Sequence, residues 1–151
     1  MQITSDMVKE LREQTGISVM QCKAALEEAG GDKTKALEIL AKKGAAISAK
    51  KGDRTLGAGT IASYIHANKQ IGTMVMLRSE TDFVSKNEEF VALAKDIALH
   101  IAASEAEDVA ALLTEPYVKD DSKTIQVLIE SAVQKFGERI EIEKFVRYSM
   151  K

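Results

Sequence analysis

The stretch that decides the fold is Ile71-Gly-Thr-Met-Val-Met-Leu-Arg-Ser-Glu80, which runs directly into Thr81-Asp82-Phe83-Val84. Its side chains alternate, which predicts a strand with one face formed by Ile71, Thr73, Val75 and Leu77 and the other by Met74 and Met76. The following Asn87-Glu-Glu-Phe90 has a capping residue and two acids, as is typical of a helix N-terminus. A carboxylate and an aromatic ring are therefore predicted on a strand-to-helix connection, where binding residues often lie.

The segments around this stretch predict an α+β core over residues 59–151. Residues 60–66 also alternate, and the turn at Asn68-Lys-Gln70 joins them to the 71–78 strand as a hairpin. Apolar residues recur at helical spacing over 90–101 and 125–136, and a short helix is expected over 108–114. Residues 139–148 predict a last strand. We expect a small antiparallel three-stranded sheet with helices packed on one face.

Residues 1–45 predict three short helices. Thr4, Ser18 and Asp32 are placed to cap them, and the expected ends are Gly16, Gly30-Gly31 and Lys42-Lys43-Gly44. This pattern resembles the ubiquitin-associated three-helix module, which suits docking because so small a core has little room for a catalytic cleft. Residues 46–58 are small, basic and glycine-containing. They fit a linker, or a third helix that continues and packs on the following domain.

Composition excludes several classes of protein. The 151 residues are 45% hydrophobic and 29% charged, with a net charge of −2, which argues against nucleic acid as the main partner. No apolar run is long enough to span a membrane, and no signal peptide is recognisable. The single cysteine, Cys22, cannot form an intrachain disulfide, so a reducing cytoplasm is the expected location.

The sequence offers little that points to covalent catalysis. It has no glycine-rich phosphate loop and no zinc pattern, so we expect no metal site and no cofactor. His66 and His100 lie outside any recognisable motif, and Cys22 is expected to be a small core residue.

Two apolar side chains are candidates for a binding surface. Taking 100° per residue, Met20 lies roughly 160° from Cys22 around the second helix, so it is expected to point outward. Phe83 lies seven residues before Phe90. A continuous helix would place both rings in the core, and from spacing alone this is the favoured interpretation, whereas a new helix at Asn87 would leave Phe83 free.

Thr81-Asp82-Phe83-Val84 after a hairpin resembles the hallmark of the elongation factor Ts family, the guanine nucleotide exchange factors of bacterial translation. Further blocks are similar in the same order: Val8-Lys-Glu-Leu-Arg12-Glu-Gln-Thr-Gly16, Met20-Gln-Cys-Lys-Ala-Ala-Leu26, Gly31-Asp32 and Lys42-Lys43-Gly44-Ala45. The second core repeat and C-terminal module of longer members have no counterpart before Lys151. The chain therefore resembles the short form of the family.

The resemblance implies a function, a partner and its contacts. It implies binding to elongation factor Tu and promotion of GDP release, without covalent chemistry. Thr81, Asp82, Phe83 and Val84 would form the exchange motif, with Asp82 and Phe83 entering the nucleotide-binding domain and displacing Mg²⁺. Arg12, Val19 and Met20 would form a docking patch. A non-covalent homodimer of the 59–151 core, giving a 2:2 complex, would replace the missing repeat.

Two other functions remain open at the level of sequence. The three-helix module could belong to a protein–protein adaptor without exchange activity, in which Phe83 would be inert. Alternatively, the chain could be a small enzyme that uses Cys22 or His66.

Overall fold

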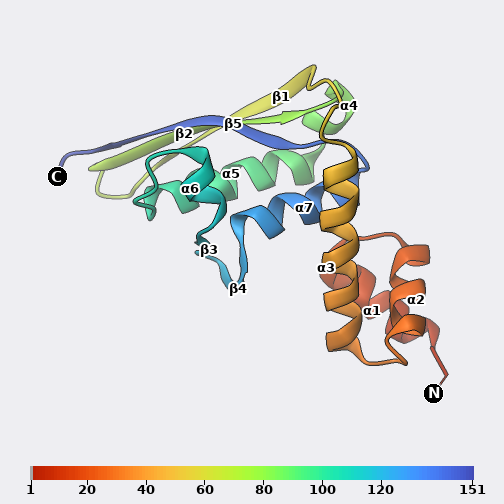
Figure 1. Ribbon diagram of the computed structural model, residues 1–151. Coiled ribbons are helices and arrows are strands. Elements are labelled where there is room, and N and C mark those ends of the chain that lie inside the picture. The colour runs from red at the N-terminus through yellow and green to blue at the C-terminus, as the bar shows by residue number, and fades with distance from the viewer. Residues whose placement is uncertain (1) are drawn as a thin grey trace.

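The computed structural model describes residues 2–151 and confirms the expected α+β architecture (Figure 1). The N-terminal part contains α1 (Ser5–Thr15), α2 (Val19–Glu28) and α3 (Lys33–Lys50). The core has two long helices, α5 (Glu88–Ala102) and α7 (Ile125–Phe136), and two short ones, α4 (Asp82–Ser85) and α6 (Val109–Leu113). Its main strands are β1 (Ala58–Ile65), β2 (Ile71–Ser79) and β5 (Glu141–Ser149).

The caps expected from the sequence are present. The side chains of Thr4, Ser18 and Asp32 accept hydrogen bonds from the first turns of α1, α2 and α3. Gly16 ends α1 with a φ of 72°, a left-handed conformation that glycine adopts without a steric penalty. The cap residues at the two ends of α1 are therefore those that the sequence indicated.

The end expected for the third helix is wrong. α3 continues beyond Gly44 to Lys50. Residues 46–50, which the sequence allowed to be either linker or helix, therefore belong to the helix. Gly44 is buried where α3 packs against α7, and Ile47, one turn further on, packs on the core. Tertiary packing explains the difference, because the glycine serves the close approach of two helices and does not cap one of them.

The sheet has the order β1-β2-β5, and both pairings are antiparallel. In Figure 1 α5 and α7 lie beneath it, and the opposite face is open. Along β1 the core side holds Ala58 and Ala62, whereas Ile61 and Ile65 face outward. A register shift between Met76 and Leu77 marks an irregularity in the β2–β5 pairing.

Two separate clusters of buried side chains form the interior. The larger one lies between the sheet, α5 and α7 and is centred on fully buried residues such as Leu77, Phe90, Ile97 and Ile125. The smaller one holds the N-terminal helices together through Leu11, Cys22, Leu26 and Leu40. Among residues 2–151, no helix is long and apolar enough to cross a membrane.

One element was not expected from the sequence. A small hairpin forms from β3 (Pro116–Tyr117) and β4 (Asp120–Thr124), between α6 and α7. The β4 sequence, Asp-Asp-Ser-Lys-Thr, is entirely polar, so it carries no alternation of apolar residues by which a strand could be predicted.

Candidate partner-binding site

The exchange motif predicted from the sequence forms a one-turn helix at the end of β2. Thr81 caps α4, and its Oγ1 atom accepts a hydrogen bond from the Val84 N–H at 3.4 Å. Asn87 then caps α5 separately, by accepting a hydrogen bond from the Glu89 N–H at 2.8 Å. Two consecutive helices therefore replace the continuous helix that spacing alone had favoured.

The break between α4 and α5 separates the two phenylalanines. Phe90 is fully buried and packs edge-on against Phe136, whereas Phe83 is 88% exposed. The interpretation of Phe83 as a core residue, which its spacing from Phe90 had favoured, is therefore wrong. Asp82 is also exposed. An apolar ring and a carboxylate thus project into solvent from adjacent positions, and exposed aromatic rings of this kind are typical of surfaces that bind another macromolecule.

The other side of α4 is fixed to the core. Val84 and Ser85 are buried, and Val84 belongs to the main hydrophobic cluster. The Thr60 hydroxyl of β1 donates to the Ser85 carbonyl at 2.8 Å, and the Ser79 hydroxyl donates to the Thr81 carbonyl at 3.0 Å. The motif therefore presents Asp82 and Phe83 from a well-anchored base.

Sequence reasoning missed one residue at this site. Glu138, in the loop between α7 and β5, accepts hydrogen bonds from the backbone N–H groups of Glu80 and Thr81 and from the Thr81 hydroxyl. It is 57 residues from Thr81 in the chain, and no local motif connects the two. Only the tertiary structure brings them together.

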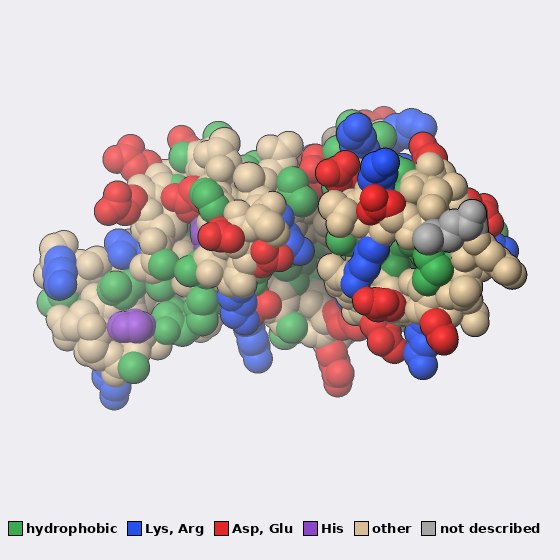
Figure 2. All heavy atoms as spheres, turned by 90° about the horizontal axis from the view of Figure 1, so that it is seen from below, with side chains coloured by type: hydrophobic (Ala, Val, Ile, Leu, Met, Phe, Trp, Pro, Cys, Tyr) green, Lys and Arg blue, Asp and Glu red, His purple; other side chains and the backbone are tan. Residues whose placement is uncertain are grey.

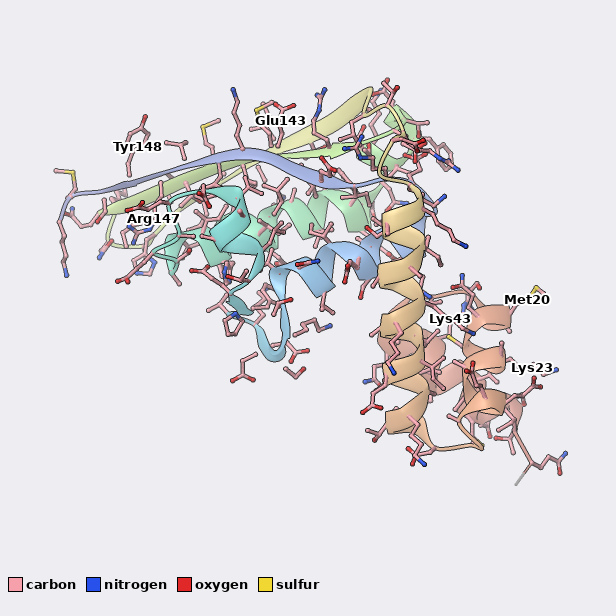
Figure 3. All side chains as sticks on the ribbon, viewed as in Figure 1. Met20, Lys23, Lys43, Glu143, Arg147 and Tyr148 are labelled. Atoms are coloured by element: carbon pink, nitrogen blue, oxygen red, sulfur yellow. The ribbon has the colours of Figure 1, made fainter. Side chains whose placement is uncertain are left out.

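A second exposed surface lies on the N-terminal helices. Arg12 of α1 and Val19 of α2 line one groove of about 500 Å³, together with Ile3, Thr4, Ser5, Val8, Lys9 and Lys23. Met20 does not line this groove, but it is 83% exposed at the start of α2. Figure 3 shows Met20 and Lys23 projecting away from the three helices. The arrangement fits an apolar contact rimmed by positive charge.

The outer face of the sheet is a third exposed surface. We call the outward-facing side chains of Ile61, Ile65, Met74 and Tyr148 the open sheet face; all four are substantially exposed. Figure 3 shows Tyr148 and Glu143 on this side and Arg147 on the helix side. A shallow apolar groove of about 210 Å³ crosses it, lined by Ile61, Met74, Met76, Lys144, Phe145 and Val146.

Cys22 and His66, the two residues considered for an enzymatic role, differ in their exposure to solvent. Cys22 is fully buried and its Sγ–H donates to the Ile17 carbonyl, so a substrate could not reach it. His66 is exposed, and its Nδ1 lies 3.0 Å from the Tyr64 hydroxyl. Within residues 2–151, no group of three or more potential ligands is placed to hold a metal ion.

His100 belongs to a structural network. Its Nδ1 accepts a hydrogen bond from the Val118 N–H, so its Nε2 carries the proton and donates to Glu115 at 3.0 Å. The Ser104 hydroxyl also donates to Glu115, at 2.7 Å. Because this hydroxyl faces the carboxylate and not the imidazole, the histidine is not placed to activate it.

Charges are mixed over the surface between the two parts of the molecule. Figure 2, which views the molecule from the helix side, shows acidic and basic side chains interspersed on that face. This distribution differs from the continuous basic stripe typical of proteins that bind nucleic acid.

The chain is similar to proteins of one family. A family model described as "Elongation factor TS" matches residues 80–151. The chain is 39% identical to the elongation factor Ts of Desulforamulus reducens, with 99% of this chain and 89% of that protein aligned. It is 41% identical to the elongation factor Ts of Thermodesulfovibrio yellowstonii, with 99% and 97% aligned. The elongation factor Ts of Clostridium kluyveri is 43% identical, but 98% of this chain aligns with only 48% of that protein.

Proposed function

This chain belongs to the elongation factor Ts family of translation elongation factors, and we propose that it is the guanine nucleotide exchange factor of elongation factor Tu. In this role it binds the GDP form of that protein and promotes release of GDP, without making or breaking a covalent bond. The observation that carries the proposal is the pair of exposed side chains, Asp82 and Phe83, on a turn whose other side is fixed in the core.

Exchange follows from differential binding. A factor that binds the nucleotide-free partner more tightly than the GDP-bound partner must weaken GDP binding by the same ratio, because coupling between two ligands is reciprocal. The factor therefore needs a contact that the GDP-bound conformation of the partner resists. A rigidly presented ring that pushes between elements of the nucleotide-binding domain is such a contact.

We assign this role to Phe83, with Asp82 disturbing the magnesium site of the partner. Mg²⁺ bridges phosphate oxygens and neutralises their charge, so its displacement weakens the hold on the β-phosphate. Thr81 and Val84 support the pair from below: Thr81 caps α4, and Val84 is buried in the core.

Arg12, Val19 and Met20 form the second contact in this proposal. Val19 and Met20 are exposed and apolar, and Arg12 offers a planar cation for carboxylates or carbonyl groups of the partner. α3 runs from these helices to the end of the sheet near α4 (Figure 1). Two contacts on one scaffold act as a bivalent ligand, in which the docking patch raises the effective concentration of Asp82 and Phe83 at the nucleotide-binding domain.

We further propose that the chain works as a homodimer, in a 2:2 complex with elongation factor Tu. The occupant of the open sheet face would be a second copy of this chain related by a two-fold axis. Two observations support this. The open sheet face exposes Ile61, Ile65 and Met74, and the longer Clostridium kluyveri relative holds roughly as much chain again as the part that aligns.

The experiment that tests the function is release of a fluorescent GDP analogue from elongation factor Tu, with unlabelled GDP in excess. The expected result is a release rate that rises with the concentration of this chain and then saturates. A rate that does not respond to the chain would contradict the proposal. If the chain binds elongation factor Tu in a pull-down without accelerating release, it is an adaptor instead.

A further inference from the structure

The exchange motif is held in place by a residue far away in the sequence, and we propose that Glu138 is the positioning residue that sets how Asp82 and Phe83 are presented. This inference rests on the proposed exchange function. It adds a residue outside the motif, on a different loop, whose carboxylate acts through Thr81 and not by contact with the partner.

Three donors converge on the Glu138 carboxylate. Its Oε1 accepts from the Glu80 N–H at 3.1 Å and from the Thr81 N–H at 3.0 Å, and its Oε2 accepts from the Thr81 hydroxyl at 2.7 Å. Hydrogen bonds to an ionised acceptor are stronger than those between neutral groups. Together they fix both backbone and side chain at the residue that immediately precedes Asp82.

The contact with the Thr81 hydroxyl also organises α4. A hydroxyl has one proton, and here it is donated to Glu138, which leaves the lone pairs of Oγ1 facing the Val84 N–H. The cap of α4 therefore depends on which way the Glu138 carboxylate turns the Thr81 hydroxyl. A four-residue helix has almost no intrinsic stability, so such side-chain contacts decide whether it forms.

A second carboxylate binds the same two loops in the opposite direction. Glu80 Oε2 accepts from the Arg139 N–H at 2.5 Å, and Glu80 Oε1 lies 3.4 Å from the Arg54 guanidinium. The two loops thus exchange hydrogen bonds from backbone N–H groups to carboxylates: Glu80 and Thr81 donate to Glu138, and Arg139 donates to Glu80. This reciprocal pairing keeps the α7–β5 loop against the β2–α4 turn.

The consequence for exchange is preorganisation. Phe83 is exposed, so the direction in which its side chain leaves the main chain is set by the backbone of residues 80–85 and not by contacts of the ring. If the turn were free to adopt several conformations, part of the binding free energy would be spent on ordering it when the ring enters the partner. Glu138 removes this cost before the partner arrives.

The decisive variant is Glu138→Gln, which has nearly the same shape. Its amide oxygen can replace one acceptor, but its NH₂ group is a donor and cannot accept from the Thr81 hydroxyl. We expect the maximal rate of GDP release from elongation factor Tu to fall about tenfold, as fits the loss of a charge-assisted hydrogen bond. The concentration for half-maximal rate should change less than twofold, because the docking patch is untouched. The control Glu107→Gln removes the same charge from an exposed position, and should leave both quantities unchanged.

Thr81→Val provides the coupling test. The double variant combines Glu138→Gln with Thr81→Val. If Glu138 acts through the Thr81 hydroxyl, the rate of GDP release from elongation factor Tu with the double variant should be within twofold of the rate with the slower single variant. Three results would overturn the inference. The first is a double variant in which the losses of the two single variants multiply, and the second is a maximal rate for Glu138→Gln within twofold of wild type. The third is a change in the concentration for half-maximal rate with no change in the maximal rate.

Hydrogen exchange separates this inference from the function itself. In Glu138→Gln and Glu138→Ala the amides of Thr81 and Val84 should exchange about tenfold faster than in wild type, while those of the buried β2 residues stay protected. Unchanged protection of Thr81 and Val84 overturns the positioning role. A wild-type chain that does not accelerate GDP release from elongation factor Tu overturns the proposed function, and with it any role of Glu138 in exchange. The amide exchange rates still decide whether Glu138 orders the turn.

Discussion

Gly44 of α3 lies directly against the side chain of Gln134 on α7: a Cβ atom at Gly44 would be 2.8 Å from Gln134 Oε1 and 3.4 Å from the Glu130 carbonyl oxygen. The Gln134 amide, in turn, donates to Gln21 of α2 at 2.8 Å. One glycine and one glutamine thus set the distance between the helices that carry the docking patch and the core that carries the exchange motif.

Gly44→Leu should separate the two parts or strain the helices that join them. A side chain at this crossing has no room, and overpacking typically costs about 1–3 kcal/mol. Denaturant unfolding should show a loss of this size. The matched control is Ala46→Leu on the exposed side of the same helix, which should leave stability within about 0.5 kcal/mol of wild type. Equal stabilities of the two variants would contradict the role given to the crossing.

Phe83→Ala should slow GDP release from elongation factor Tu without affecting the fold. Truncation of a central aromatic anchor typically costs about 2–4 kcal/mol of binding, and an 88% exposed ring contributes little to stability. The paired variant is Phe90→Ala, which removes a fully buried ring and should destabilise the chain by about 3–5 kcal/mol. Stopped-flow release and thermal melting separate the two effects. A release rate for Phe83→Ala equal to that of wild type would exclude the role proposed for the Phe83 ring.

Met20→Asp should weaken binding to elongation factor Tu while leaving the fold intact. Met20 is 83% exposed, so the charge is solvated in the free chain and becomes costly only in an apolar contact. Calorimetry should show a clear loss of affinity, and Val118→Asp, on the β3–β4 hairpin, should show none. Deletion of the N-terminal helices (residues 1–52) would be a less specific test, because it would also remove the contacts of α3 with α7. Equal affinities for both variants would refute the docking patch.

Ile65→Lys should convert the proposed homodimer into a monomer. Ile65 is exposed on β1, so the lysine is harmless in a free chain but would place a charge in an apolar interface. Light scattering at micromolar concentration should give about twice the chain mass for wild type and the single chain mass for the variant. A monomeric wild-type chain that still accelerates GDP release from elongation factor Tu would show that exchange does not need the dimer.

The Tyr117 phenol should titrate well above the usual range for tyrosine. Burial raises the pKa of its phenol to about 12, with the nearby Asp96 and Asp120 carboxylates contributing in the same direction. Because the folded pKa lies above the unfolded value, this stabilisation is complete below about pH 10 and is lost as the pH rises toward 12. Absorbance near 295 nm should show one late phenol, and Tyr117→Phe should remove that phase. A single early titration would contradict the assignment.

The pKa of the neighbouring Asp120 carboxyl is shifted in the opposite direction, downward, so it affects stability at acidic pH. Hydrogen bonds from the Ser122 hydroxyl and N–H lower the pKa of its carboxyl. Its contribution to stability is therefore present above the ordinary carboxyl pKa and is lost as the pH falls through the lowered value. Because Asp120 is on the surface, we expect this effect to be small.

Local signals in the sequence determined most of the secondary structure. The caps at Thr4, Ser18 and Asp32, the alternation in β1 and β2, and the apolar spacing of α5 and α7 act over a few residues, so they are legible without the fold. The separate cap at Asn87 was also visible, and it is this cap that frees Phe83. Met20 could be predicted to point outward because helical geometry alone decides which face of α2 it occupies.

Only the tertiary structure decided the features that depend on distant residues. Gly44 has the sequence pattern of a helix end, but α7 turns it into a packing contact within a longer helix. The face of β1 that is buried follows from where α5 lies, since both faces contain apolar side chains. The partnership of Glu138 with Thr81 joins residues 57 positions apart, and hydrogen bonds across such a separation exist only once the sheet and α7 have brought the two loops together.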